Sequence, residues 1–452
     1  MSERAALRTL VLLAMNVGIA APLVAHAQPL PEIEIACDAG DSLQAALAAV
    51  ATGGRIIIRS GTCTGNLTLA RDVRIQGNGY DRVMLKATDR ALPVVTVPHG
   101  VTAVISGVSI SGGRVGLWMT GRVLLAFSSV TGNSSGGIEV RDNGSLDGDK
   151  LRVTRNNGPG ITILKGEAAL RGSVIANNVT NGDGGGGMFL VAGRAELTGT
   201  QLEENESIRD GGGLLATQKS TLVLDRVRLF RNTARTGHGG AIALSGSTAD
   251  ITGSSLFENL ADAGNGGGIA VLSDGEVSLT NTTVASNVAS FQFPSRPGGW
   301  GGGLYVDKTS KAQVVHTTIV LNSARFAAGI ASNNSVTLLA SLLSGNLGAS
   351  KAGECGGTGR VESKGWNLLM DPGDCRFMSK PGDLMGASPR LGTPGLYGGA
   401  WNTVPLRDGS PAIDRIPLQA CAGSLDQRLK PRPANGGCDV GAYERQPEDM
   451  MP

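Results

Sequence analysis

Aliphatic residues recur along this chain in short runs, and the runs follow a sequence repeat of 21 to 28 residues, here called a beat. Runs such as LVL, ADIT and VSLT alternate with a period of two rather than the 3.6-residue period of a helix. An aliphatic residue stands three positions before the asparagine of each beat, as Leu202, Leu229 and Leu256 do. The asparagines are Asn133, Asn156, Asn177, Asn205, Asn232, Asn259, Asn287, Asn322 and Asn346. Each beat is therefore predicted to hold several short strands and no helix.

Strands that return to the same register once per beat must wind as a coil whose turns stack on one another, because a single turn cannot bury its own inner face. Strands of neighbouring turns then lie about 4.8 Å apart and hydrogen-bond along the stack. We predict an all-β fold: one parallel β-solenoid of roughly eleven coils with three short sheets. Leu202, Leu229 and Leu256 should be consecutive neighbours in one interior column.

The repeated asparagines and glycines have structural roles in such a coil. Asparagine tolerates the left-handed conformation of a sharp corner, and asparagines one coil apart can hydrogen-bond to each other. Glycine pairs such as Gly239–Gly240 supply a second corner, where a positive φ or a close backbone approach is needed. The predicted structural ladder consists of Asn177, Asn205, Asn232, Asn259, Asn287 and Asn322.

Residues 1–27 have the pattern of a cleaved export signal. Arg4 and Arg8 precede the apolar stretch TLVLLAMNVGIAAPLV, and Ala25–His26–Ala27 forms a small-residue cleavage site. A membrane anchor is the alternative, but the apolar stretch is short. We expect an exported mature protein beginning at Gln28, without a transmembrane segment, that is secreted, periplasmic or non-covalently attached to a cell surface.

The cysteine count agrees with export, since an even number outside the cytoplasm suggests disulfides. Six cysteines admit about 15 pairings, and sequence alone does not choose among them. They fall into three clusters, and we expect pairing within each: Cys37 with Cys63, Cys355 with Cys375, and Cys421 with Cys438. No pair has the C-x-x-C spacing of a metal site, so no metal is expected there. The net charge of +2 gives no reason to expect nucleic acid as a partner.

Two stretches resemble known families. Residues 41–79, DSLQAALAAVATGGRIIIRSGTCTGNLTLARDVRIQGNG, look like the start of pectin-lyase-like right-handed β-helices, in which an amphipathic helix caps the first coil. Residues 409–444, with SPAID, DQR, PRP and CDVGAYE, resemble the choice-of-anchor Q domain of exported bacterial proteins. These resemblances imply a β-helix with its N-terminal cap over 28–350 and a disulfide-bonded C-terminal cap over 351–452.

The fold also invites a search for an active site. In the strand after each glycine pair, the second residue is predicted to point outward. These residues form a row along the solenoid, here called the outward file, which consists of Glu139, Thr162, Phe189, Leu215, Ala243, Ala270, Tyr305 and Ala331. A pectate lyase would need several carboxylates there to hold Ca²⁺, and a glycosidase would need a carboxylate pair. Gly237–His238–Gly239 matches one polygalacturonase element, without its companions. We identify no catalytic residue and expect no cofactor, with Ca²⁺ required only if the protein is a lyase.

Charged residues in the tail, Asp414, Asp426, Arg428, Asp439 and Glu444, could serve acid–base chemistry, but buried ion pairs that close the fold are the favoured interpretation.

A long beat between Asn287 and Asn322 holds the insertion SFQFPSRPGGW. Such insertions often carry function, although these aromatic residues could also fold back onto the sheet. Candidate binding residues are Phe291, Phe293, Trp300, Phe189 and Tyr305. The sequence favours a non-catalytic, adhesin-like scaffold that recognises carbohydrate or a surface protein. The alternative is a carbohydrate-active enzyme, a polysaccharide lyase or a glycoside hydrolase.

Overall fold

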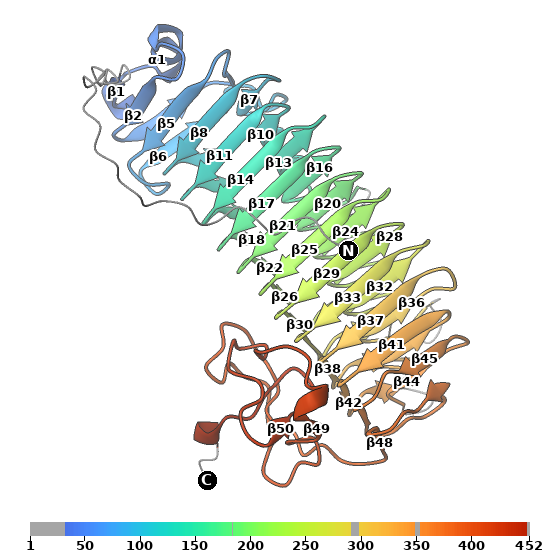
Figure 1. Ribbon diagram of the computed structural model, residues 1–452. Coiled ribbons are helices and arrows are strands. Elements are labelled where there is room, and N and C mark those ends of the chain that lie inside the picture. The colour runs from blue at the N-terminus through green and yellow to red at the C-terminus, as the bar shows by residue number, and fades with distance from the viewer. Residues whose placement is uncertain (1–31, 183, 291–297, 349–352, 450–452) are drawn as a thin grey trace, which may run out of the picture.

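A right-handed β-solenoid of about 13 turns forms most of the molecule in the computed structural model, which describes residues 32–182, 184–290, 298–348 and 353–449 (Figure 1). The sequence predicted roughly eleven turns. The additional turns lie at the ends, where no ladder asparagine marks the coil. Three long parallel sheets, here called A, B and C, run the length of the solenoid with 15, 14 and 12 strands, and a shorter sheet D has seven.

Sheet A comprises β1 (Glu32–Ile35), β2 (Arg55–Ile58), β5 (Val73–Gly77), β8 (Thr102–Ser106), β11 (Arg122–Ala126), β14 (Ser145–Asp149), β17 (Glu167–Arg171), β21 (Arg194–Thr198), β25 (Thr221–Asp225), β29 (Thr248–Thr252), β33 (Glu276–Thr280), β37 (Lys311–Val315), β41 (Ser335–Leu339), β45 (Arg360–Ser363) and β47 (Phe377–Met378). Sheet B comprises β3 (Gly61–Thr64), β6 (Val83–Lys86), β9 (Ser109–Ser111), β12 (Ser129–Thr131), β15 (Arg152–Thr154), β18 (Val174–Ala176), β22 (Gln201–Glu203), β26 (Arg228–Phe230), β30 (Ser255–Phe257), β34 (Thr283–Ala285), β38 (Thr318–Val320), β42 (Leu342–Ser344), β46 (Leu368–Leu369) and β48 (Leu384–Met385).

Sheet C comprises β4 (Leu67–Thr68), β7 (Val95–Val97), β10 (Val115–Met119), β13 (Gly136–Arg141), β16 (Ile161–Leu164), β20 (Met188–Val191), β24 (Leu214–Thr217), β28 (Ile242–Ser245), β32 (Ile269–Leu272), β36 (Leu304–Val306), β40 (Ile330–Ser332) and β44 (Cys355–Gly356). Sheet D comprises β19 (Val179–Thr180), β23 (Glu206–Ser207), β27 (Thr233–Ala234), β31 (Leu260–Ala261), β35 (Val288–Ala289), β39 (Ser323–Ala324) and β43 (Leu347–Gly348).

The interior is built from columns of like side chains. Leu202 pairs with Leu229, and Leu229 pairs with Leu256, on the consecutive strands β22, β26 and β30. All three side chains are fully buried in the main core. The predicted interior column is therefore confirmed, and the coils stack in register because each turn buries its apolar face against the next.

Buried asparagines form a continuous ladder beside sheet B. The side-chain oxygen of each one accepts hydrogen bonds from the main-chain N–H and the amide of the asparagine one coil before it, as Asn232 does for Asn205. The ladder runs through Asn133, Asn156, Asn178, Asn205, Asn232, Asn259, Asn287, Asn322 and Asn346.

Asn177 was wrongly assigned to this ladder. It is exposed and has a φ of 56°, whereas its neighbour Asn178 is fully buried and occupies the rung. The corner has two residues: the first takes the left-handed conformation and points outward, as Glu204 does before Asn205, and the second points inward. In the pair Asn177–Asn178, asparagine suits both positions, so the sequence alone did not distinguish them.

The N-terminal end is covered by a short amphipathic helix, as the resemblance implied. Helix α1 spans Leu43–Ala49, and the Ser42 hydroxyl accepts a hydrogen bond from the Ala45 N–H at its start. Leu43, Ala46 and the following Val50 are buried against the first coils. The 3₁₀ turn Cys37–Ala39 precedes the helix, and a disulfide joins Cys37 to Cys63 of β3.

The C-terminal part is held by two disulfides, Cys355–Cys375 and Cys421–Cys438. Residues 353–386 complete the last turns, and residues 387–449 then lie beside the solenoid against the outer face of sheet B (Figure 1). This segment contains the antiparallel pair β49 (Ile416–Pro417) and β50 (Gly437–Cys438) and the 3₁₀ turns Leu418–Ala420 and Pro447–Asp449. It buries an apolar strip on β30, β34, β38 and β42 formed by Phe257, Ala285, Val320 and Leu342.

Candidate functional site

The predicted outward file of sheet C exists in unbroken register. Successive strands pair Glu139 with Thr162, Thr162 with Phe189, and so on through Leu215, Ala243, Ala270 and Tyr305 to Ala331. The file also continues toward the N-terminus, because Trp118 of β10 pairs with Glu139. Trp118 is half-buried and was missed from the sequence, because no glycine pair precedes it in the repeated position.

Loops cover the middle of this file. Leu215, Ala243 and Ala270 are buried although they point away from the core. In these coils, the loop after the sheet D strand folds back onto the start of the next sheet C strand. It turns at a glycine with positive φ, such as Gly239 (φ 69°), where an added Cβ would collide with the Ile242 carbonyl oxygen. The apolar stripe expected from Phe189 through Leu215 to Tyr305 is therefore interrupted.

A change in coil length leaves the start of the file open. The ladder spacing is 23 and 22 residues from Asn133 to Asn178, and 27 in each of the next three coils. The longer coils also contain a strand of sheet D and a loop that covers sheet C. The first long coil therefore projects beyond the short coils before it, and this step is here called the ledge. A groove of about 840 Å³ lies there, over β13, β16 and β20. Its lining includes Arg114, Glu139, Arg141, Asn157, Thr162, Thr180 and Phe189.

The groove combines an aromatic ring with polar side chains. Phe189 is half-buried and lies on β20 beside Thr162 of β16. Glu139 is 8% exposed, and its carboxylate is bound by the guanidinium of Arg141, two residues along the same strand. Arg114 contributes a second guanidinium from the turn before β10. Such a surface can stack against the face of a sugar ring and hydrogen-bond to its hydroxyls.

Trp300 and Tyr305 lie elsewhere. Trp300 stacks on Phe326 of the next coil at a centroid distance of 4.6 Å. Tyr305 lies 6.3 Å from the ring of His238 and accepts a hydrogen bond from the Asn333 side chain, and burial raises its pKa. The aromatic rings of this region thus pack on neighbouring coils. Phe291 and Phe293 lie outside the described residues.

His238 is part of a second, mixed ladder at the glycine corner. The Asp210 carboxylate accepts the His238 N–H at 2.6 Å, and His238 Nδ1 accepts the Asn265 N–H at 3.0 Å. Asn265 Oδ1 in turn accepts the Trp300 N–H. Each side chain supports the backbone of the following coil, so the Gly-His-Gly sequence has a structural explanation here.

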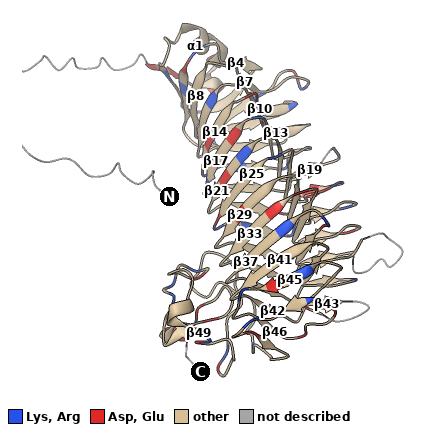
Figure 2. Cartoon of the chain, turned by 45° about the vertical axis from the view of Figure 1, so that its right-hand side comes forward, with Lys and Arg blue, Asp and Glu red and all other residues tan. Residues whose placement is uncertain are grey.

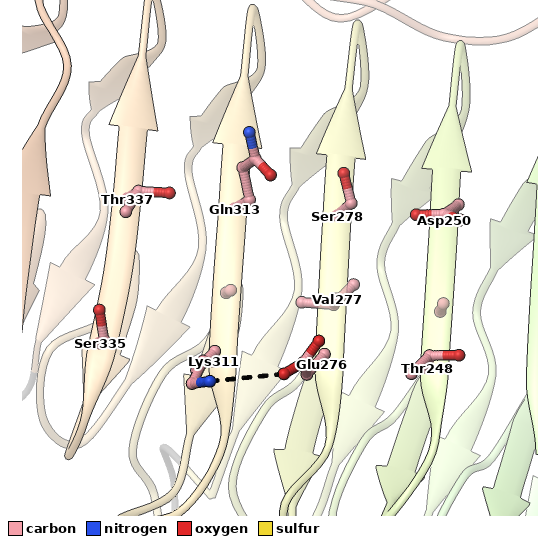
Figure 3. A pocket seen from close by; sticks show the side chains of 11 residues that line it. Thr248, Asp250, Glu276, Val277, Ser278, Lys311, Gln313, Ser335 and Thr337 are labelled. Atoms are coloured by element: carbon pink, nitrogen blue, oxygen red, sulfur yellow. Dashed lines mark ion pairs between the residues drawn. The ribbon is translucent and has the colours of Figure 1, made fainter. Parts of the chain in front are cut away.

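A second, smaller groove of about 530 Å³ lies on the outer face of sheet A (Figure 3). Two rows of polar side chains cross four strands. Asp250, Ser278, Gln313 and Thr337 form one row, and Thr248, Glu276, Lys311 and Ser335 form the other. Glu276 pairs with Lys311 at 3.6 Å. Charged residues of both signs are spread along this face (Figure 2), and several pair between coils, including Arg55 with Glu32 and Arg171 with Asp147.

Four of the five charged residues named in the tail are buried and three of them, Asp426, Arg428 and Glu444, form ion pairs, whereas Asp414 is exposed. Arg428 and Asp426 are both buried, and their side chains lie 2.9 Å apart. Asp439 and Glu444 accept main-chain N–H groups, and burial raises the pKa of Asp439 to about 7. Arg432 lies within 3.4 Å of Glu444 and contacts the buried His316 of the solenoid. These carboxylates therefore organise the segment and attach it to the coil.

Within the described ranges, no cluster of three or more His, Cys, Asp or Glu side chains is arranged to hold a metal ion. In the same ranges, no helix has the length and apolar character needed to cross a bilayer.

A comparison with protein families agrees with the architecture over part of the chain. Residues 57–226 match the family described as "Right handed beta helix region". Two solved structures are similar over most of the chain. The pectate lyase Pel9A is 14% identical, with a TM-score of 0.39, covering 92% of this chain and 96% of its own. The catalytic unit of a thermostable GH87 alpha-1,3-glucanase from Streptomyces thermodiastaticus strain HF3-3 is 12% identical, with a TM-score of 0.45, covering 80% and 71%. No curated protein matches the sequence.

Proposed function

We propose that this chain is an exported β-helix scaffold that binds carbohydrate in the groove over β13, β16 and β20 without cleaving it. The observation that carries the proposal is that Phe189 is partly exposed and lines the groove at the ledge, whereas loops bury Leu215, Ala243 and Ala270 in the following coils. An aromatic ring surrounded by hydroxyl, amide and guanidinium groups suits a sugar ring. The signal-like residues 1–27, the three disulfides and the choice-of-anchor Q resemblance support export.

The number of carboxylates in the groove favours binding over catalysis. Among its described lining residues, Glu139 is the one carboxylate, and Arg141 neutralises it. Glycosidases need two carboxyl groups about 5 to 10 Å apart, one of them as a proton donor. The described lining of the groove therefore holds one carboxylate, already paired with a guanidinium, and lacks the second carboxyl group that a glycosidase requires.

The alternative function is a glycoside hydrolase that uses the groove on sheet A. Asp250 pairs with Ser278, so it is the diagonal neighbour of Glu276. Strand spacing and rise place the two Cα atoms on the order of 8 Å apart, which is compatible with a carboxylate pair. Both side chains are exposed on an open face and Glu276 also contacts Lys311, so this arrangement is less specific than the groove at the ledge.

One experiment separates the two functions. The processed protein is applied to a glycan array and incubated with the polysaccharides it retains, and reducing ends and unsaturated uronate absorbance are recorded. We expect binding without turnover, and Phe189→Ala should weaken binding at least tenfold. The control Leu347→Ala, which truncates an exposed apolar side chain near the far end of the solenoid, should bind normally. Turnover abolished by Asp250→Asn or Glu276→Gln would establish the hydrolase instead, and unchanged binding by Phe189→Ala would exclude the ledge groove.

A further inference from the structure

The turn from sheet A to sheet B places one residue of each coil in the left-handed conformation. Glycine takes this position in four coils, at Gly107, Gly172, Gly199 and Gly253, and other coils place Lys150, Arg226, Asn281, His316 or Ala340 there, all with positive φ. Phe127 takes it one coil after Gly107, with φ 47°. A bulky L-residue is strained there, because its Cβ approaches the following carbonyl oxygen, whereas glycine is not. The chain therefore maintains an unfavourable conformation at Phe127.

Burial does not offset this strain. Phe127 is 50% exposed and lies outside the three buried apolar clusters of the described residues. Its ring has a polar neighbour, the ammonium group of Lys150 on the next coil, 5.0 Å from the centroid. Other non-glycine residues also take this turn conformation, so the feature particular to Phe127 is a large apolar ring that is half exposed, which points to a role at the surface.

A groove of about 530 Å³ lies beside this ring, toward the N-terminus. Tyr80, which is 42% exposed, borders it from an earlier coil. Between the two aromatic residues the floor is bare backbone, because Gly77 and Gly107 approach so closely that a Cβ on either would collide with the carbonyl oxygen of the other. The chain has 16 aromatic residues other than histidine, eight Phe, four Tyr and four Trp, and two of them border this one small groove.

The polar lining is also arranged for a ligand. The Gln76 carbonyl oxygen accepts a hydrogen bond from Arg55 at 2.6 Å, which leaves the amide nitrogen of Gln76 as a donor. Asp81 offers a carboxylate acceptor, and Ser106, which pairs with Gln76 across the sheet, offers a hydroxyl. Tyr80 and Phe127 lie two coils apart along the solenoid axis, a separation of about 10 Å. This separation leaves room for one sugar ring between the two aromatic side chains.

We propose that Tyr80 and Phe127 form a second glycan-binding site, in which the C–H face of a pyranose stacks on the aromatic rings and its hydroxyls bond to Asp81 and Gln76. The inference rests on the proposed carbohydrate recognition, but it uses none of the residues of the ledge groove. Two sites on one rigid rod would bind a long polysaccharide more tightly than a short oligosaccharide, because the second contact becomes intramolecular.

The test uses the full processed protein and isothermal titration calorimetry with cellohexaose, xylohexaose, mannohexaose and hexagalacturonate, followed by the corresponding polymer. Phe127→Gly installs the residue that the preceding coil carries at this turn, Gly107. It should weaken binding of the polymer at least tenfold and leave the melting temperature unchanged or raised. Tyr80→Ala should weaken polymer binding similarly, and Phe189→Ala should affect only the ledge site.

The outcomes are distinct. Binding that is lost in Phe189→Ala but intact in both Phe127→Gly and Tyr80→Ala overturns the second site and leaves the first. A clear fall in the melting temperature of Phe127→Gly also overturns it, since the ring would then have a packing role. Lack of binding across the whole panel overturns both proposals.

Discussion

The carboxylate of Glu354 ends the asparagine ladder by accepting hydrogen bonds from the side-chain amide and the main-chain N–H of Asn346. It occupies the place that the next asparagine would take. Glu354 is 1% exposed, and this burial raises its pKa to about 7. The last rung of the ladder is therefore sensitive to pH, unlike the asparagine rungs before it.

Glu354→Gln should remove this sensitivity. A carboxyl whose pKa is raised from 4.5 to about 7 on folding contributes stability below pH 4.5, and this stability is lost as the pH rises through 7. Glutamine keeps the acceptor oxygen without the charge. The variant should be more stable than the wild type at pH 8, by on the order of 3 kcal/mol, and similar at pH 4.5. Urea unfolding at both values measures the difference, and parallel pH profiles of the two proteins would contradict it.

The two asparagines of the Asn177–Asn178 corner provide a matched test of the ladder. Asn178→Ala removes the acceptor for the main-chain N–H and side-chain amide of Asn156, and one donor to the Val153 carbonyl. Leaving such groups buried and unpaired should cost about 2 to 4 kcal/mol of the free energy of unfolding. Asn177→Ala changes an exposed left-handed residue and should cost at most about 1 kcal/mol. Equal losses in chemical denaturation would show that the ladder adds little.

Truncation of the interior column should be strongly destabilising. Leu229 is fully buried between Leu202 and Leu256, so Leu229→Ala leaves a cavity in a stack that cannot easily collapse. We expect a loss of about 3 to 5 kcal/mol in unfolding free energy. Leu321→Ala, at a 45% exposed position, is the control and should change stability by less than about 0.5 kcal/mol. A Leu229→Ala protein with wild-type stability would contradict the inward assignment.

His316 should make attachment of the C-terminal segment sensitive to acid. Burial and the neighbouring Arg432 lower the pKa of His316 to about 2. Its contribution is therefore present above pH 6.5 and is lost as the pH falls. His316→Asn places asparagine in a turn position that Asn281 already occupies one coil earlier. From pH 6.5 to 5, wild-type stability should fall relative to the variant by about 1.4 kcal/mol per pH unit.

Hydrogen exchange of residues 400–449 follows this attachment directly. The comparison between the two proteins is necessary because burial raises the pKa of Asp439 and Glu444 in the same segment. Those carboxylates favour the folded state as the pH falls, which opposes the effect of His316. Identical pH profiles of the wild type and His316→Asn would exclude the proposed role of the histidine.

The order of apolar and polar positions was enough to establish the coil. A beat that places Leu202, Leu229 and Leu256 at equal spacing forces like residues into columns, because only stacked turns bury them. The same regularity gave the outward file of sheet C, from Glu139 to Ala331. Local ambiguity remained where two adjacent residues suit a corner equally, as at Asn177 and Asn178.

The sequence by itself thus determined the solenoid, its interior columns and its glycine corners, since these follow from periodicity and backbone conformation. Tertiary structure alone decided which outward residues meet solvent. Leu215 and Phe189 stand in the same file, but loops from longer coils cover the first and leave the second open. It also decided that residues 387–449 lie along sheet B, and that Tyr80 and Phe127 border one groove. These relationships depend on which coils and loops become neighbours in space, and the periodic pattern along the chain does not record that.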